Sequence, residues 1–354
     1  MFEQLGLEIS PRQASIILGL LIGLAFGAMA EVSRFCFRRA VAGPVAERKS
    51  AAGVWLAGLA TAMIGTQVAV AQGLISFDAH RFMVTDIPVL AIAVGGLIFG
   101  AGMVLTRGCV ARLTVLAGTG NLRAVLVLLT FAVIAHATLK GVLTPIRTAL
   151  SGVTLPVSSA ALPGSPLIWT VLIAGAAGLA ALRFADNRRN LALGALIGLL
   201  VPVAWVGTGY VLFDEFDPIA LEGISFTSPA TEALFWTVAS SAIPAGFGVG
   251  LLGGVIAGAL ALSRISGRFA WQSFTSPRQT GRYLGGAALM GVGGVLAGGC
   301  TIGAGLSGVP TLSIAAVLAL LSIGVGGALT ARLIRDGVSS TGADQATSPT
   351  PQAA

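Results

Sequence analysis

The sequence is poor in charged residues. Only 10% of its 354 residues are Asp, Glu, Lys or Arg, whereas a soluble domain carries about 25%. So few charges cannot cover the surface of a water-soluble particle of this size. Together with 55% hydrophobic residues, this excludes a soluble enzyme and a disordered chain. Histidine and cysteine are scarce too. Two His exclude a His-rich metal site, and three Cys cannot all pair into disulfides.

Recognised catalytic motifs are also absent. The chain contains no GxSxG, no HExxH, no CxxC and no Walker loop. The Gly-x-Gly string at 118–120 lacks a strand–turn–helix context, so it does not predict a dinucleotide site. We therefore expect a protein that is not an enzyme and that holds no metal ion and no other cofactor.

Glycine and long apolar stretches are abundant instead. Glycine supplies 49 of the 354 residues, about twice its usual share, and glycine inside apolar runs is typical of closely packed membrane helices. A helix needs about 20 apolar residues to cross a bilayer. The sequence therefore predicts an all-α integral membrane protein with about nine transmembrane helices. They are expected roughly at 14–33, 51–73, 87–106, 123–143, 166–184, 191–213, 238–263, 282–298 and 312–334.

The segments that connect these spans alternate in charge. Arginine gathers in every second segment, beginning with 34–50, while 74–86 is nearly neutral and 214–232 is acidic. The positive-inside rule then places the N-terminus outside and the C-terminus in the cytoplasm. Most of the net charge of +7 is explained in this way, so we expect membrane lipid and no nucleic acid as a partner. We expect one transmembrane domain over 1–335 and a disordered polar tail at 336–354.

An internal repeat divides the transmembrane domain. The segment 95–109 matches 286–300 at an offset of 191 residues, with seven identities in fifteen. A weaker match relates 22–24 to 197–199. Five spans separate equivalent points, and because this number is odd, equivalent helices must run in opposite directions. The repeat therefore predicts an inverted-topology architecture with halves at about 14–165 and 166–335.

Both strongly matching segments end in Gly-Cys, followed by residues that favour a break in the helix. A glycine-rich stretch follows Cys109, and another, ending in Pro310, follows Cys300. Non-helical backbone at membrane depth is tolerated only where it is buried in protein or lines a cavity. These breaks predict short re-entrant helices around a site near the midplane.

Cys36, Cys109 and Cys300 each lie where an apolar span ends. A lone Cys is most often a small buried hydrophobic residue, and this alternative stays open for Cys36, which has no counterpart at the weaker repeat offset. The other two are equivalent in the repeat, which favours a functional role. A neutral thiol is a weak donor and acceptor that can contact a polarizable sulfur-containing anion, whereas a thiolate could bind Cu(I).

The neighbours of the cysteines favour an anion. Nearby arginines would raise the local anion concentration, although an arginine beside a span is normally a topology anchor. Arginine also favours the thiolate, which would repel an anion, so an anion path requires thiols held neutral in an apolar wall. Backbone N–H groups beside glycine can cradle an anion. The candidate substrate-binding residues are Cys36, Cys109, Cys300, Gly108, Gly299, Arg34 and Arg107.

Three short segments resemble the YeeE/YedE family of bacterial inner-membrane sulfur transporters, whose characterised members take up thiosulfate. They are Ser-Arg-Phe-Cys-Phe at 33–37, Arg-Gly-Cys-Val-Ala-Arg at 107–112 and Gly-Gly-Cys-Thr-Ile-Gly at 298–303. The two Gly-Cys pieces are fairly specific. The resemblance covers essentially all the spans, roughly 14–335, and excludes the tail.

The resemblance implies an hourglass-shaped protein with nine transmembrane helices and short helices that do not cross the membrane. It implies a multi-pass protein of the bacterial inner membrane with a periplasmic N-terminus. It also implies that thiosulfate passes along three cysteines, here Cys36, Cys109 and Cys300, through S–H···S hydrogen bonds. A small soluble protein resembling a sulfur carrier would meet the transporter on its cytoplasmic side. Some relatives are associated with selenium or other sulfur compounds, so the resemblance implies a class of substrates and not thiosulfate alone.

Two other functions remain open on the sequence alone. A membrane-embedded sulfurtransferase would form a persulfide on one of the cysteines and would gain the mass of one sulfur atom. A soft-metal transporter would use the thiols as ligands, but the absence of Met-rich or His-rich tracts speaks against it. Uptake of thiosulfate or a related small sulfur-containing anion is the leading hypothesis.

Overall fold

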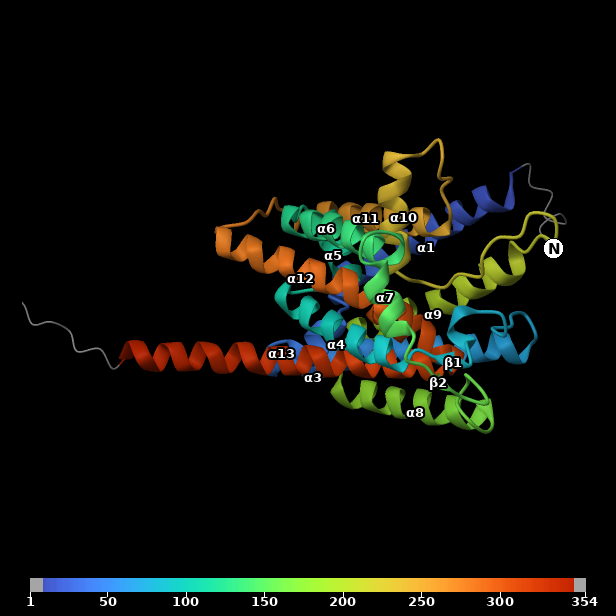
Figure 1. Cartoon of the computed structure of the whole chain (residues 1–354), viewed down its shortest axis with the longest axis horizontal. Helices are drawn as coiled ribbons and strands as arrows, with labels where there is room; N and C mark the ends of the chain where they lie inside the picture. Colours follow the sequence, from blue (N-terminus) through green and yellow to red (C-terminus); the bar gives the residue numbers. More distant parts are fainter. Residues whose placement is uncertain (1–8, 347–354) are drawn as a thin grey trace, which may run out of the picture.

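The computed structural model describes residues 9–346, with side chains described up to residue 334. In this part of the chain, nine helical segments are long and apolar enough to cross a membrane, which confirms the all-α fold and the number of spans. Most of them run along the long axis of the molecule (Figure 1). Their helices are α1 (Pro11–Ser33), α3 (Val45–Ala71), α4 (Val89–Leu105), α6 (Leu122–Lys140), α8 (Pro166–Phe184), α9 (Arg188–Val206), α11 (Phe247–Ile265), α12 (Pro277–Leu296) and α13 (Ile314–Ala346).

Short elements interrupt or connect the spans. The strands β1 (Asp86–Ile87) and β2 (Leu155–Pro156) pair antiparallel and join the connection before α4 to the connection before α8. The short helices matter more for the site, because several follow directly on a long helix. They are α2 (Phe37–Ala42), η2 (Arg81–Met83), α5 (Val110–Gly118), α7 (Thr144–Ser151), η3 (Gly207–Val211), α10 (Thr227–Val238), η4 (Thr301–Gly308) and η5 (Val309–Thr311).

The seventh span starts later than the sequence predicts. We expected it near residue 238, but that residue ends the separate helix α10, and α11 begins at Phe247. The intervening stretch contains Pro244, which has no N–H to donate and disfavours a helical residue before it. Hydropathy alone does not register this break, because the residues around the proline are mostly apolar.

Helices α1 and α11 pack with their backbones in contact. A Cβ atom added to Gly23 of α1 would lie closer than van der Waals distance to the carbonyl oxygen of Leu251. One added to Gly254 of α11 would meet the carbonyl of Leu20 in the same way. Gly198 of α9 approaches the backbone of α3 just as closely. The abundance of glycine therefore serves close helix packing, as expected where helices associate in lipid.

The pattern of helix contacts agrees with the internal repeat. Equivalent spans of the repeat are five spans apart, so α1 is equivalent to α9, and α3 to α11. In the structure α1 packs on α11 and α3 packs on α9, so each contact becomes the other when the halves are exchanged. Each contact joins one half to the other, which interlocks them. The boundaries of the halves at 14–165 and 166–335 stay a prediction.

Helix α13 continues past its membrane-spanning part. The sequence predicts a disordered tail over 336–354, whereas the helix runs to Ala346. Residues 347–354 lie outside the described residues, and for them the disorder stays a prediction.

Candidate functional site

Each of the three cysteines begins a short helix soon after a long helix ends. Cys36 is the N-cap residue of α2, Cys109 of α5 and Cys300 of η4. Their exposed fractions are 4%, 2% and 0%. The three thiols therefore lie at buried interruptions of the helical structure, where the sequence predicts them.

A left-handed residue stands two positions before each cysteine. These residues are Arg34 (φ 52°), Arg107 (φ 60°) and Gly298 (φ 72°). This conformation commonly ends a helix and turns the chain, and for a non-glycine residue it costs roughly 1–2 kcal/mol. The same turn thus delivers a cysteine to the start of a short helix three times. Cys36 shares this geometry with the other two, although the weaker sequence offset gives it no counterpart.

The three short helices bring their cysteines into one region. The thiols of Cys36 and Cys109 are hydrogen-bonding neighbours. The hydroxyl of Thr301, the residue after Cys300, lies beside the Cys109 thiol without a hydrogen bond of regular geometry. The Cys300 sulfur accepts a hydrogen bond from the backbone N–H of Gly303 at 3.4 Å, which leaves its S–H free to donate. We call Cys36, Cys109, Cys300 and Thr301 the thiol layer.

A basic cavity of about 470 Å³ opens on one side of the thiol layer and reaches Cys36. We name it the Arg112 cavity. Six arginines and two glutamates line it, which leaves a formal net charge of +4. Such a concave, positive surface attracts anions. Its charged residues are Arg34, Arg38, Arg39, Arg107, Arg112, Arg268, Glu31 and Glu47.

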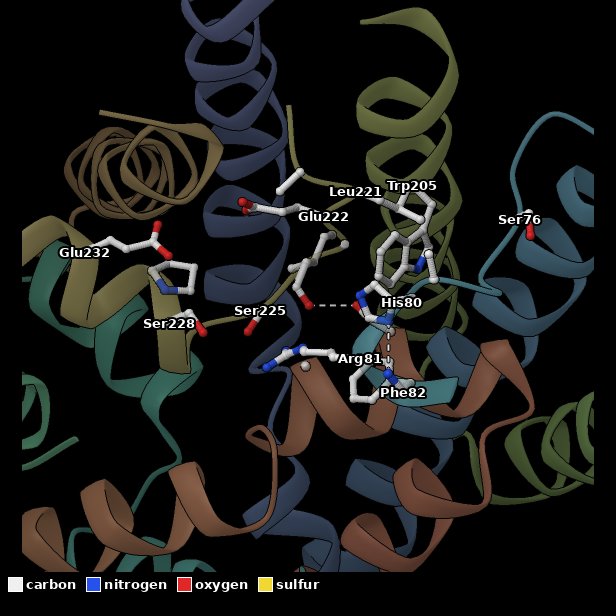
Figure 2. Close-up of a pocket in the computed structure, with 17 residues that line it drawn as sticks. Ser76, His80, Arg81, Phe82, Trp205, Leu221, Glu222, Ser225, Ser228 and Glu232 are labelled. Carbon is white, nitrogen blue, oxygen red and sulfur yellow. Dashed lines mark hydrogen bonds between the residues drawn. The ribbon is translucent and has the colours of Figure 1, made fainter. Parts of the chain in front are cut away.

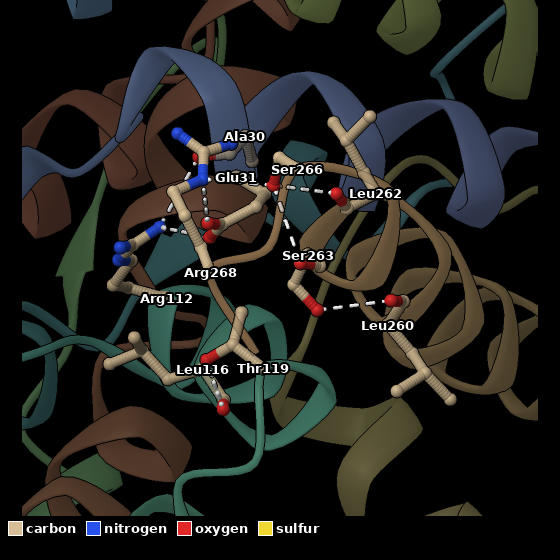
Figure 3. A network of polar contacts seen from close by, with 10 residues as sticks. All are labelled: Ala30, Glu31, Arg112, Leu116, Thr119, Leu260, Leu262, Ser263, Ser266 and Arg268. Carbon is tan, nitrogen blue, oxygen red and sulfur yellow. Dashed lines mark hydrogen bonds and ion pairs between the residues drawn. The ribbon is translucent and has the colours of Figure 1, made fainter. Parts of the chain in front are cut away.

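Glu31 holds two of these arginines in place (Figure 3). Its carboxylate lies 3.8 Å from Arg112 Nη1 and 3.6 Å from Arg268 Nε. Arg112 also donates to the backbone oxygen of Ala30 at 3.2 Å. Because Glu31 belongs to α1, Arg112 to α5 and Arg268 to the connection before α12, this network joins three elements at the wall of the cavity.

Replacing Glu31 with alanine is expected to destabilise the protein by on the order of 3 kcal/mol, because a buried arginine is left without its counter-charge. The side chains of Glu31 and Arg112 are only 9% and 14% exposed. The matched control is Glu47→Ala. Glu47 pairs with Arg39 at 2.7 Å but is 50% exposed, so its loss should change little. Thermal melting of the purified variants checks this, and equal shifts for both would contradict it.

A second cavity, of about 520 Å³, lies on the other side of the thiol layer. We name it the Glu222 cavity. Gly303 and Ser307 of η4 form part of its wall, and Arg81 lies near Cys300. Figure 2 shows side chains from three separate parts of the chain converging on it. Its titratable lining residues are His80, Arg81, Glu222 and Glu232.

Burial shifts the titration of this cavity. It lowers the pKa of His80 to about 4, with a smaller effect from Arg81, so His80 is neutral at neutral pH. Burial raises the pKa of Glu222 to about 7; Glu232 adds to this rise and Arg81 opposes it. Partial burial also raises the pKa of Glu232, which reaches solvent, again against the effect of Arg81. The charge of the cavity therefore changes near neutral pH.

The two cavities lie at opposite ends of the helical bundle. The connection before α3 supplies Arg38 and Arg39 to the Arg112 cavity, and the connection after α3 supplies His80 and Arg81 to the Glu222 cavity. At 1.5 Å per residue, the 27 residues of α3 span about 40 Å. The thiol layer therefore lies between a cavity at each end.

The structure places the predicted site residues unequally. The Arg112 cavity is lined by Cys36 and by two exposed arginines, Arg34 and Arg107. The side chains of Cys109 and Cys300 are enclosed. A Cβ at Gly299 would lie 2.9 Å from the backbone nitrogen of Ala304, so η4 needs a glycine there. A Cβ at Gly108 would make only ordinary contacts of 3.4–3.6 Å. That these residues bind substrate stays a prediction.

Sequence reasoning missed the residues of the Glu222 cavity. Arg81 lies in a connection that the sequence shows as nearly neutral, and Glu222 and Glu232 lie in one that reads only as acidic. No motif marks them, because they come together from separate connections. The available signal was the acidic character of 214–232 in a chain with so few charges.

The geometry bears differently on the two alternative functions. Among the described residues, no group of three or more His, Cys, Asp and Glu could hold a metal ion. The cysteines of the thiol layer form no disulfide, and Cys36, which lines the basic Arg112 cavity, is the thiol best placed to form a persulfide.

Three buried thiols lie between two cavities, and nine helices in the described part of the chain are long and apolar enough to cross a membrane. This is the architecture of a membrane transporter for a small polar solute. The chain belongs to the sulphur transport family, whose model matches residues 32–329. This agrees with the resemblance carried by the three cysteine segments.

Two characterised relatives are similar over most of the chain. The thiosulfate transporter TsuA of Escherichia coli (strain K12) is 27% identical over 323 residues, which cover 82% of this chain and 86% of the relative. The thiosulfate transporter TsuA of Spirochaeta thermophila is 26% identical over 322 residues, which cover 85% and 93%. Both relatives are transporters by name.

Proposed function

We propose that this protein takes up thiosulfate across the bacterial inner membrane and passes it from the Glu222 cavity through the thiol layer to the Arg112 cavity. One observation carries the proposal: in a member of the sulphur transport family, three buried thiols separate two cavities at opposite ends of the bundle. By the positive-inside rule the Glu222 cavity faces the periplasm and the Arg112 cavity the cytoplasm. The N-terminus is then periplasmic and the C-terminus cytoplasmic.

The positions of the thiols support one order of contact. Cys300 starts η4, whose later residues line the Glu222 cavity, so it meets the anion first. Cys109 lies between, beside Thr301 on one side and Cys36 on the other. Cys36 lines the Arg112 cavity and meets the anion last.

Thiol chemistry suits the terminal sulfur of thiosulfate. That sulfur is large, polarizable and weakly hydrated, and it accepts a hydrogen bond from a neutral S–H group. The free S–H of Cys300, beside the small residues of η4, meets this requirement. Because each S–H···S contact is weak, the anion binds without being trapped at any one cysteine.

The positive charge of the Arg112 cavity supports release on the cytoplasmic side. Arginines at its mouth draw the anion out of the thiol layer, while the ion pairs of Glu31 keep Arg112 and Arg268 from binding it too tightly. The same basic surface suits the docking of a small soluble sulfur-carrier protein, the partner that the family resemblance implies.

The direct test is uptake of sulfur-labelled thiosulfate into proteoliposomes that contain the purified protein. We expect saturable uptake that unlabelled thiosulfate abolishes. Excess sulfate should compete only weakly, because it carries an oxygen where thiosulfate has its terminal sulfur. Protein-free liposomes are the control. Absence of uptake would refute the function, and equal competition by sulfate would refute recognition of the sulfur atom by the thiols.

A further inference from the structure

The Glu222 cavity holds more negative than positive charge, although it belongs to the path of an anion. Glu222 and Glu232 both line it, and Arg81 is the one cation among its lining residues. With both carboxyl groups ionised the cavity carries a formal charge of −1. A dianion such as thiosulfate would then be repelled at the opening of its own path. Protonation of one carboxyl group removes this net charge, and protonation of both leaves the cavity positive.

The structure presents the Glu222 carboxyl group to the cavity from a fixed backbone. The backbone N–H of Glu222 donates to Thr208 Oγ1 at 3.0 Å, and the same Oγ1 lies 2.9 Å from the Glu222 carbonyl oxygen. Thr208 is 1% exposed. Figure 2 shows the Glu222 side chain pointing toward Glu232, with Arg81 below them in the view, beside Ser225. No ion pair within 4 Å joins the two glutamates to Arg81 among the described residues.

Two buried donors without partners line the same cavity. Trp205 is 2% exposed, and its Nε1–H has no hydrogen-bond partner. The hydroxyl of Ser225 also lacks one. Buried donors without partners are rare and costly in proteins, and they leave unused hydrogen-bonding capacity in the wall of this cavity. Unused donors in its wall favour a ligand that accepts hydrogen bonds, as an oxyanion does.

Anion binding and proton binding are therefore linked in this cavity. A bound anion raises the proton affinity of the carboxyl group beside it, and by reciprocity the proton raises the affinity for the anion by the same factor. The other groups that face Glu222 do not take this role. His80 is neutral, and Arg81 keeps its proton at every physiological pH.

We propose that the Glu222 cavity binds the anion together with a proton, that Glu222 holds this proton, and that the anion and the proton enter the cell as a pair. This inference rests on the proposed uptake of thiosulfate and assigns its coupling ion. Because a dianion and one proton together carry a net charge of −1, the pH difference across the membrane, and not its electrical potential, drives accumulation of the anion. Glu232 adds the second negative charge that makes the proton necessary.

The test uses the purified full-length protein in proteoliposomes with sulfur-labelled thiosulfate and a pH dye inside. Because the pKa of Glu222 is about 7, its protonated fraction falls about tenfold between an outside pH of about 6 and about 8. Thiosulfate stays a dianion over this range. Wild-type initial uptake should fall by a similar factor, and the dye should report acidification of the lumen when thiosulfate enters.

The variant Glu222→Gln carries a neutral side chain of the same size. It should take up thiosulfate at a rate that varies less than about twofold over the same pH range, and acidification should disappear. The matched control is Glu215→Gln, an exposed residue of the same connection that does not line the cavity. It should keep the wild-type pH dependence and the acidification.

The outcomes separate this inference from the function on which it rests. Uptake that does not depend on outside pH, or a Glu222→Gln variant as steep as wild type, overturns proton coupling and leaves thiosulfate transport intact. A wild-type protein that takes up no thiosulfate overturns both. In that case infrared spectra still test the carboxyl group itself: a band that titrates near neutral pH and is lost in Glu222→Gln identifies the proton site without transport.

Discussion

Replacing Cys109 or Cys300 with alanine is expected to abolish thiosulfate-dependent growth of a bacterium that lacks its own uptake system. Both thiols are enclosed between the two cavities, with 2% and 0% of their surface exposed. Alanine removes the S–H donor and leaves only a methyl group to meet a charged anion, which then finds no partner in an apolar layer. Growth on thiosulfate as the only sulfur source measures the effect.

The loss of function should not reflect loss of the folded protein. Removing one buried sulfur atom changes stability by roughly 1 kcal/mol, so the abundance and melting temperature of both variants should stay close to wild type. Normal growth of both variants on thiosulfate would overturn the role of the thiols. The variant Cys300→Ser separates hydrogen-bond donation from the polarizability of the sulfur atom. Its hydroxyl group still donates a hydrogen bond, but it is neither polarizable nor weakly hydrated, so growth should remain poor. A mass increase of one sulfur atom on the wild-type protein would instead favour the sulfurtransferase.

Replacing Gly254 with valine is expected to prevent formation of the folded protein. A Cβ at this position of α11 would overlap the backbone of Leu20 in α1. The obstacle is a main-chain carbonyl, which cannot move aside as a flexible side chain would. The two helices would have to separate along their length, and in lipid no hydrophobic effect drives them together again. A loss of about 3 kcal/mol or more is expected from overpacking of this kind.

Its neighbour supplies the matched control. Gly253 lies on the same helix, and a Cβ added there would meet no atom within 4 Å. Gly253→Val should therefore be produced in normal amounts and melt near the wild-type temperature. Size-exclusion profiles and melting curves of the two variants in detergent check the difference. Similar behaviour of both variants would contradict the view that backbone contact between α1 and α11 holds the fold together.

The spans, the start of α11 and the geometry of the cysteines were not equally predictable from the sequence, for physical reasons. The nine spans were predictable, because the need to exclude charge from lipid applies to every residue of a span and its signal adds up along the chain. The start of α11 was not, because one proline in an apolar stretch changes the backbone without changing hydropathy. The equivalence of Cys109 and Cys300 was visible in their glycine-rich surroundings. The similar geometry of Cys36 was not, because Arg34 adopts the left-handed conformation that Gly298 adopts without strain.

The sequence by itself determined the membrane architecture, the alternation of basic connections and the three cysteines as the chief chemical groups of a chain with few polar residues. Each of these depends on composition or on local order along the chain. Only the tertiary structure decided that the thiols lie between two cavities, that Cys109 lies between Cys36 and Thr301, and that Arg81, Glu222 and Glu232 share the Glu222 cavity. These facts depend on contacts between segments far apart in the chain, which the packing of α1 on α11 and of α3 on α9 establishes. Hydropathy and charge measure where a segment lies in the membrane, and they carry no information about which segment lies beside it.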